Sequence, residues 1–224
     1  MRKDFANNNI RQGNLFSESE FVNEKTSSKL DLNILSLPDA EISFYPHFFE
    51  KTESDLMFES LFNEIKWRSD KIKIYGKEID LPRKTAWYGE VGKVYKYSGI
   101  QMLPEPWTPT LLKIKTKIEK VAKVEFNSVM MNLYRDGSDG ISWHTDAEPE
   151  LGKNPTIGSV SFGESRRFML RHRNNKTLKS EIELTHGSFL LMGGSTQHFW
   201  QHQIPKTSKK LGARINLTFR AIIS

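Results

Sequence analysis

The chain contains no cysteine among its 224 residues. This absence excludes disulfide frameworks, thiol catalysis, iron–sulfur clusters and cysteine-based zinc sites together. Any metal must therefore be held by histidine and carboxylate side chains. No segment approaches the ~18 consecutive apolar residues of a membrane-spanning helix, and residues 1–10 lack the apolar run of a secretory signal. We therefore expect a soluble, intracellular protein that does not bind membranes.

The composition is that of a folded protein with one sizeable core. Hydrophobic residues make up 37% of the chain, with 14 Phe and 5 Trp, so wholesale disorder is excluded. The length favours one domain of about 150–200 residues with a tail. The excess of 33 Lys+Arg over 27 Asp+Glu gives a net charge of +6, which favours a polyanionic partner. Because the placement of charges matters more than their sum, other observations must decide the function.

Composition divides the chain into three regions. Residues 1–33 are rich in Asn, Ser, Glu and Lys and are predicted to be a flexible N-terminal tail, whereas residues 34–125 are predicted to form an N-terminal extension. Residues 126–224 contain short runs of strand-forming residues separated by Gly, Pro, Asn and Ser, which favours an antiparallel sandwich. The predicted fold is α+β, with two helices outside a jelly roll. The predicted strands cover 41–45, 129–133, 158–162, 167–171, 181–184, 188–192 and 215–219.

Two segments of the extension carry apolar residues at helical spacing. The pattern predicts helices over 53–68 and 109–123. Thr52 is the predicted N-cap of the first helix, and Thr108-Pro109 is the predicted start of the second. Five lysines on the other face of the second helix are interpreted as a solvated surface.

The segment Arg214–Arg220 has one apolar and one polar face if it is a strand. Residues two apart share a face, so Arg214, Asn216, Thr218 and Arg220 would point the same way. On the outside of a sandwich this would be an ordinary solvated face. If the polar face points inward, the two arginines need anionic partners, and a dicarboxylate ligand would supply them. From the strand alone, the solvated arrangement is the simpler interpretation.

A second pattern is His144-Thr-Asp146, in which an imidazole and a carboxylate share one face of an extended segment. A further histidine would complete a triad of two His and one carboxylate, which leaves three positions open on non-haem Fe(II). His-x-Asp occurs by chance in many proteins, so the pattern alone does not establish a metal site. The remaining histidines are His47, His172, His186, His198 and His202.

The order of six motifs closely resembles the AlkB family of Fe(II)/2-oxoglutarate-dependent dioxygenases, over residues 74 to 221. The motifs are Asn132–Gly137, His144–Asp146, Pro155–Gly163, His186–Met192, Trp200–His202 and Arg214–Arg220. The strongest resemblance is to the animal DNA-repair branch, because Pro82-Arg-Lys and Tyr95-Lys-Tyr-Ser-Gly also fit that branch. The resemblance implies a double-stranded β-helix (jelly roll) core, with flanking N-terminal helices and a nucleotide-recognition lid within residues 34–125.

The resemblance also implies the ligand set and the chemistry. His144, Asp146 and His202 correspond to the iron ligands, which are also the catalytic positions. The 2-oxoglutarate pocket corresponds to Asn132, Tyr134, Arg214, Asn216, Thr218 and Arg220. Within it, Arg220 is expected to bind the far carboxylate and Arg214 to lie near the iron. With Fe(II), 2-oxoglutarate and O2, such enzymes form succinate and carbon dioxide, hydroxylate an N-methyl group and release it as formaldehyde.

The implied substrates are N1-methyladenine and N3-methylcytosine in DNA. A base must be flipped out of a duplex or presented on a single strand before it is attacked. The expected substrate contacts are Tyr75, Gly76, Arg83, Tyr95, Tyr97 and Glu148. Tyr75-Gly76 fits either a finger that wedges into duplex DNA or an ordinary hairpin tip. Ala147 departs from the resembled branch, which has a second acid at this position.

At least some of the basic residues near these motifs are interpreted as contacts to nucleic-acid phosphates. They are Arg166, Arg167, Arg171, Arg173, Lys176 and Lys179, followed by Lys206, Lys209 and Lys210.

Other hypotheses remain open from the sequence. The same chemistry would serve an RNA demethylase or a protein hydroxylase, and a jelly-roll binding module without activity is a third class. Gln12–Phe16 is similar to short peptides that bind bacterial sliding clamps, or it is a hydrophobic anchor. We expect a monomer, located in the cytoplasm or nucleoid of a bacterium or in the nucleus of a eukaryote.

Overall fold

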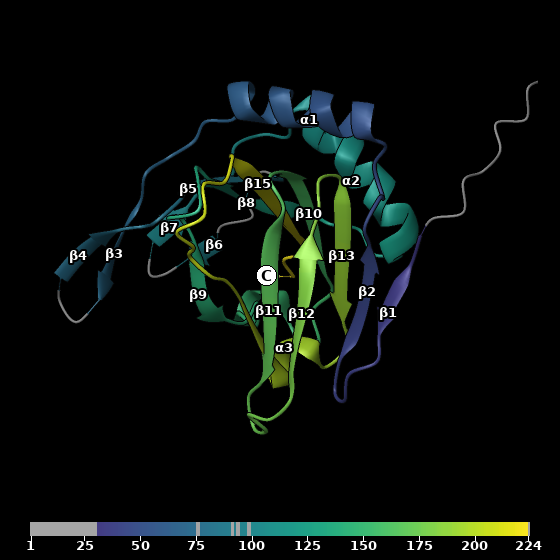
Figure 1. The fold of residues 1–224 in the computed structure, drawn as a ribbon. Coiled ribbons are helices and arrows are strands. Elements are labelled where there is room, and N and C mark those ends of the chain that lie inside the picture. The colour runs from purple at the N-terminus through teal and green to yellow at the C-terminus, as the bar shows by residue number, and fades with distance from the viewer. Residues whose placement is uncertain (1–30, 75–76, 91, 93–94, 98–99, 224) are drawn as a thin grey trace, which may run out of the picture.

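Two antiparallel β-sheets pack face to face in the computed structural model, which describes residues 31–74, 77–90, 92, 95–97 and 100–223 (Figure 1). In spatial order, the larger sheet contains β1 (Asn33–Leu35), β2 (Glu41–Tyr45), β13 (Ser188–Gly193), β10 (Ile157–Gly163), β15 (Arg214–Arg220), β8 (Ser128–Tyr134) and β5 (Lys84–Gly89). The smaller sheet contains β12 (Lys179–Leu184), β11 (Arg166–His172), β14 (Trp200–Ile204) and β9 (Ile141–His144). This arrangement confirms the predicted jelly roll.

Two short ribbons and four helical segments complete the described structure. The β3–β4 ribbon projects to one side of the sandwich, at the left of Figure 1. The ribbons are β3 (Lys71–Ile74) with β4 (Lys77–Asp80), and β6 (Tyr95–Tyr97) with β7 (Ile100–Met102). The helices are α1 (Lys51–Glu64), α2 (Pro109–Ala122), α3 (Thr196–Phe199) and the 3₁₀ turn Pro149–Leu151. Within these ranges, no helix has the length and apolarity needed to cross a membrane.

The apolar residues of β15 decide which way its polar face points. Ile215, Leu217 and Phe219 are fully buried in the core between the larger sheet and the helices α1 and α2. Because side chains alternate along a strand, the polar residues of β15 point to the opposite face, toward the smaller sheet. The solvated arrangement is therefore wrong. The arginines lie inside the sandwich, beside a second core that contains Leu170, Leu190 and other apolar residues of both sheets.

The second helix forms as its sequence predicts. Thr108 accepts a hydrogen bond on Oγ1 from the Leu111 backbone N–H (3.2 Å), and Pro109 occupies the first turn. The side chains of Leu111, Ile114 and Ile118 are completely buried. Lysines from the outer face of α2 reach α1, because Lys117 pairs with Glu53 at 2.7 Å.

The first helix differs at both ends from its prediction. Glu50, and not Thr52, is the N-cap residue, and it makes no side-chain capping bond. The helix ends at Glu64, four residues earlier than predicted. Arg68 forms a bridge with Thr85 of β5, and that pairing requires the chain to be extended after the helix. Tertiary pairing therefore overrides the local helical pattern.

Strands from both sides of residue 125 share the larger sheet. β2 pairs with β13, and β5 pairs with β8, so part of the region predicted as an extension lies in the same sheet as the region predicted as the core.

Candidate functional site

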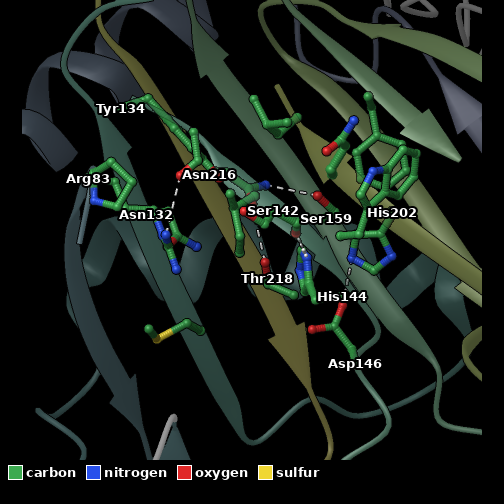
Figure 2. Close-up of a pocket in the computed structure, with 18 of the residues that line it drawn as sticks. Arg83, Asn132, Tyr134, Ser142, His144, Asp146, Ser159, His202, Asn216 and Thr218 are labelled. Atoms are coloured by element: carbon green, nitrogen blue, oxygen red, sulfur yellow. Dashed lines mark hydrogen bonds and ion pairs between the residues drawn. The ribbon is translucent and has the colours of Figure 1, made fainter. Parts of the chain in front are cut away.

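A cavity of about 690 Å³ lies between the two sheets and contains the predicted site residues. The β4 residues Ile79 and Asp80 line its rim. Figure 2 shows polar side chains from several strands pointing into this space. Among the predicted residues, those that line the cavity are Arg83, Asn132, Tyr134, His144, Asp146, Glu148, His202, Arg214, Asn216, Thr218 and Arg220.

Four predicted substrate contacts lie where the structure describes no side chain. Tyr75 and Gly76 lie outside the described residues. Tyr95 and Tyr97 lie in the short strand β6, and their positions in the chain are the only basis for their predicted role.

The candidate metal ligands come from two neighbouring strands. His144 at the end of β9 is directly opposite His202 of β14, and Asp146 follows two residues later. One ligand atom from each residue lies within 4.8 Å of the other two. The imidazole centroids of His144 and His202 are 4.3 Å apart, and His202 Nε2 lies 3.4 Å from Asp146 Oδ2. This is the donor set of a facial triad on Fe(II).

The protonation states of these groups suit a metal. His144 Nδ1 lies 2.8 Å from the Ser142 carbonyl oxygen, which only accepts, so Nδ1–H donates and Nε2 remains for the metal. Burial lowers the pKa of His144 to about 4, which keeps the imidazole neutral at pH 7. Burial raises the pKa of Asp146, but Arg220 and His202 outweigh it and hold that pKa well below its usual range. The carboxylate is therefore ionised.

The polar face of β15 forms one wall of the cavity. Asn216 Nδ2 donates to Ser159 Oγ at 2.8 Å, and Thr218 Oγ1 donates to Asn216 Oδ1 at 3.3 Å. On the neighbouring strands, Arg83 Nε donates to Asn132 Oδ1 at 2.6 Å. Figure 2 shows these amide and hydroxyl groups on the same side of the sheet as the imidazoles.

Arg214 is a fully buried cation with unused hydrogen-bonding capacity. Its Nη2 donates to Ser161 Oγ at 2.9 Å, and its guanidinium lies 5.1 Å from the Tyr134 ring centroid. Within the described part of the chain, Nε and Nη1 have no hydrogen-bond partner. Burial lowers the pKa of Arg214 to about 10, so the side chain stays charged at pH 7. An anionic carboxylate fits this position, because a buried cation is costly unless it is paired.

The positions of the two arginines reverse the predicted order. Arg220 Nη2 contacts Asp146 Oδ1 at 2.5 Å, so Arg220 lies at the metal end of β15. Arg214 is six residues away on the same strand, about 20 Å between Cα atoms at 3.3 Å per residue. The expectation that Arg220 binds the far carboxylate is therefore wrong, and Arg214 is the arginine that fits this role.

Residues 41–220 match the 2OG-Fe(II) oxygenase superfamily, which covers most of the chain. The chain belongs to this superfamily. As a 2OG-Fe(II) oxygenase it uses Fe(II), 2-oxoglutarate and O2, and the His144, Asp146 and His202 donors together with the buried Arg214 fit these groups.

Curated relatives place this oxygenase near the animal members of the AlkB family. It is 36% identical over 189 residues to the mouse DNA oxidative demethylase ALKBH2, covering 80% of this chain and 79% of the relative. It is 39% identical over 192 residues to the bovine alpha-ketoglutarate-dependent dioxygenase alkB homolog 3, covering 82% and 66%.

Solved structures agree on the fold. OsALKBH1 superposes with a TM-score of 0.62 at 15% identity, covering 85% of this chain and all of that chain. A prolyl hydroxylase from Trichoplax adhaerens superposes with a TM-score of 0.55 at 11% identity, covering 81% of this chain and 83% of that chain. At such low identity these likenesses establish the jelly roll and no more.

Two residues near the oxygenase site were missed or misread from the sequence. Arg166 belongs to the basic group from which at least some phosphate contacts are expected, but it is only 3% exposed and donates to the carbonyl oxygens of Asp136, Asp139 and Pro205. Arg166 is therefore not one of those contacts, because its guanidinium joins two loops. Gln197 was not singled out at all, because a lone glutamine carries no motif. It contacts the backbone of Asp146.

Proposed function

We propose that this oxygenase is an oxidative demethylase that repairs N-alkylated bases in DNA, with N1-methyladenine and N3-methylcytosine as its substrates. The observation that carries the proposal is a single cavity lined by the donor set His144, Asp146 and His202 and by the buried Arg214. Among the described residues, two nitrogens of Arg214 have no hydrogen-bond partner. The substrate class is supported by ALKBH2 relatives from mouse and human, at 36% and 37% identity, which are named DNA oxidative demethylases.

In this proposal, residues at one end of the cavity bind Fe(II), and a residue at the other end binds the far carboxylate of 2-oxoglutarate. His144, Asp146 and His202 bind Fe(II), which supplies the oxidising chemistry when bound. Arg214 pairs with the far carboxylate of 2-oxoglutarate, and Tyr134 covers that guanidinium on one side.

The amide and hydroxyl groups of Asn132, Asn216 and Thr218 line the space between the two ends. Arg220 contacts Asp146 and keeps it ionised.

The mouth of the cavity offers groups suited to a flipped base. Glu148 lines the cavity beside the metal ligands, where a carboxylate would favour a cationic methylated base. Arg83 also lines the cavity and donates to Asn132. We propose Tyr95 and Tyr97 as base-stacking residues and Tyr75-Gly76 as the finger, on the resemblance of their sequence positions.

Basic residues around the cavity would contact the DNA backbone. Arg171 is half-buried and stacks over the Trp143 ring at 4.2 Å, and Trp143 lines the cavity. Lys206 also lines the cavity and is exposed, with Lys209 and Lys210 close behind it in sequence. Arg167 is already paired with Glu181 at 2.6 Å, and we therefore leave it out of the phosphate contacts.

The decisive experiment measures formaldehyde and succinate release with matched oligonucleotides. The panel contains single-stranded DNA, duplex DNA and RNA, each with one N1-methyladenine or N3-methylcytosine, and the unmethylated sequences as controls. We expect release of both products with methylated DNA, and none from the Asp146→Ala variant. Faster turnover of the RNA set would identify an RNA demethylase. Succinate without formaldehyde on every oligonucleotide would contradict the proposed substrate class.

Three further properties belong to the same proposal. We expect a monomer that acts inside the cell, in the cytoplasm or nucleoid of a bacterium or in the nucleus of a eukaryote. Gln12–Phe16, outside the described residues, is proposed as a sliding-clamp contact. Deleting residues 12–16 should leave turnover unchanged and abolish binding to a purified clamp.

A further inference from the structure

Pairing between β9 and β14 fixes the positions of His144 and His202, whereas the third candidate metal ligand, Asp146, lies outside the paired strands. The last residue pair between β9 and β14 on this side joins His144 to His202. Asp146 lies two residues past the end of β9, and it is only 4% exposed. A buried backbone N–H must find an acceptor, and the sheet no longer supplies one here. The Asp146 backbone N–H donates instead to Oε1 of Gln197, at 2.9 Å.

Gln197 is well placed to act as a fixed support. It is completely buried, and it lies in α3, which runs directly into β14 and therefore into His202. Its Nε2 faces Met192 Sδ at 3.6 Å. The neighbouring Thr196 accepts a hydrogen bond on Oγ1 from the Glu41 backbone N–H at 2.9 Å, which joins α3 to β2 of the larger sheet.

Each of the two carboxylate oxygens of Asp146 has a contact. Arg220 takes Oδ1 at 2.5 Å, while Oδ2 faces His202. Both of these contacts act on the carboxylate, and neither fixes the Asp146 backbone, which lies beyond the strand pairing. The Gln197 hydrogen bond fixes the position from which the side chain extends.

We propose that Gln197 is a positioning residue, which sets the direction in which Asp146 presents its carboxylate to the iron. It does so through the Asp146 backbone and touches neither metal nor co-substrate. The role goes beyond the proposed demethylation and does not depend on which nucleic acid is the substrate. It also links the two ligand-bearing segments, because one glutamine joins the chain before β14 to the chain after β9.

The test compares metal binding by Gln197→Met with that of the unaltered full chain. Met has a similar volume but no oxygen to accept the Asp146 N–H. Mn(II) affinity is measured by titration of the free ion with electron paramagnetic resonance, and Co(II) absorption reports the ligand geometry. Gln201→Met is the matched control, because it removes a glutamine acceptor that serves Arg171 on the same short stretch of chain. Supporting contacts of this kind change metal affinity about 10- to 100-fold.

The expected result is an about 10- to 100-fold weaker Mn(II) affinity and an altered Co(II) spectrum for Gln197→Met, with both properties unchanged in Gln201→Met. Unchanged affinity and spectrum in Gln197→Met would overturn the proposal. If Gln197→Met does not fold, Gln197→Asn decides the same comparison. Its amide is one methylene too short to reach Asp146, and wild-type metal binding by this variant would equally overturn the proposal.

Discussion

Arg220 and Asp146 form a buried ion pair at the metal end of β15, with Nη2 and Oδ1 2.5 Å apart. Both side chains are at most 5% exposed. The carboxylate that serves as a candidate iron ligand is therefore already ionised before any metal binds. The same contact also gives Asp146 a structural role that the two histidine ligands do not have.

This difference predicts separate effects for two ligand variants. Asp146→Ala and His144→Ala should both abolish iron-dependent succinate formation, because each removes a donor of the triad. Only Asp146→Ala also takes away the carboxylate that faces Arg220, and breaking a buried ion pair costs about 3–5 kcal/mol. Urea unfolding of the metal-free proteins should show this larger loss in Asp146→Ala. Equal stability of the two variants would contradict the structural role.

Arg214→Lys should weaken 2-oxoglutarate binding. A lysine ammonium cannot reproduce the planar fork of a guanidinium toward a carboxylate. Hydrogen bonds to charged groups contribute about 1.5–3 kcal/mol, so the KM for 2-oxoglutarate should rise about 10- to 100-fold. Saturating 2-oxoglutarate should restore part of kcat. Arg220→Lys is the comparison. A larger rise in the KM for 2-oxoglutarate in that variant would mean that Arg220, as expected from the sequence, binds the far carboxylate.

The pairing of α1 with α2 should depend on pH. Glu53 Oε2 lies 2.7 Å from Lys117 Nζ, and Oε1 lies 3.3 Å from Lys113 Nζ. Burial raises the pKa of Glu53, but the two lysines outweigh it and the net pKa is lowered from 4.5. Because its pKa is lower in the folded protein, ionised Glu53 stabilises the fold above about pH 4.5. This contribution disappears as the pH falls through the pKa of Glu53 in the folded state.

Glu53→Gln should therefore lower the free energy of unfolding by about 0.5–1 kcal/mol at pH 7. The difference from the unaltered protein should vanish near pH 3. Glu59→Gln, an exposed position on the same helix, serves as the control and should change stability at neither pH. A Glu53→Gln deficit that persists at pH 3 would mean that the side chain acts by packing.

Tyr75 provides a prediction that depends on its sequence position alone. If it fills the space left by a flipped base, Tyr75→Ala should lose activity on duplex DNA far more than on single strands. Unstacking costs a few kcal/mol in a duplex and little in a single strand. Loss of one stacking contact of about 1–3 kcal/mol corresponds to roughly 10- to 100-fold in rate.

Turnover of 2-oxoglutarate without nucleic acid is the internal control, because the metal and co-substrate residues are unchanged. An equal loss on both DNA forms would indicate a general binding role. No loss on either form would make Tyr75-Gly76 an ordinary turn.

Local sequence signals were sufficient for elements that carry a clear pattern or capping motif of their own. Thr108 and Pro109 start α2 through a hydrogen bond three residues away, and the alternation in Arg214–Arg220 made β15 recognisable. The motif order also predicted which residues come together, since every predicted metal, 2-oxoglutarate and substrate residue whose side chain the structure describes lines the cavity.

Elements that depend on distant partners were not visible in the same way. β5 and β14 were not predicted as strands, although each pairs with strands that are distant in the sequence, β5 with β8 and β14 with β11. The end of α1 was misplaced because Arg68 forms a bridge with Thr85 of β5, and the local helical pattern does not show this contact.

The sequence by itself excluded cysteine ligands, and the order of its motifs, through the resemblance to the AlkB family, indicated the iron chemistry and the ligands His144, Asp146 and His202. Only the tertiary structure decided the direction of β15, the order of Arg214 and Arg220 along the cavity, and the contact of Gln197 with Asp146. The physical reason is that a strand has two faces and two ends. Which face is buried, and which end meets the metal, depends on what the other strands and helices pack against it.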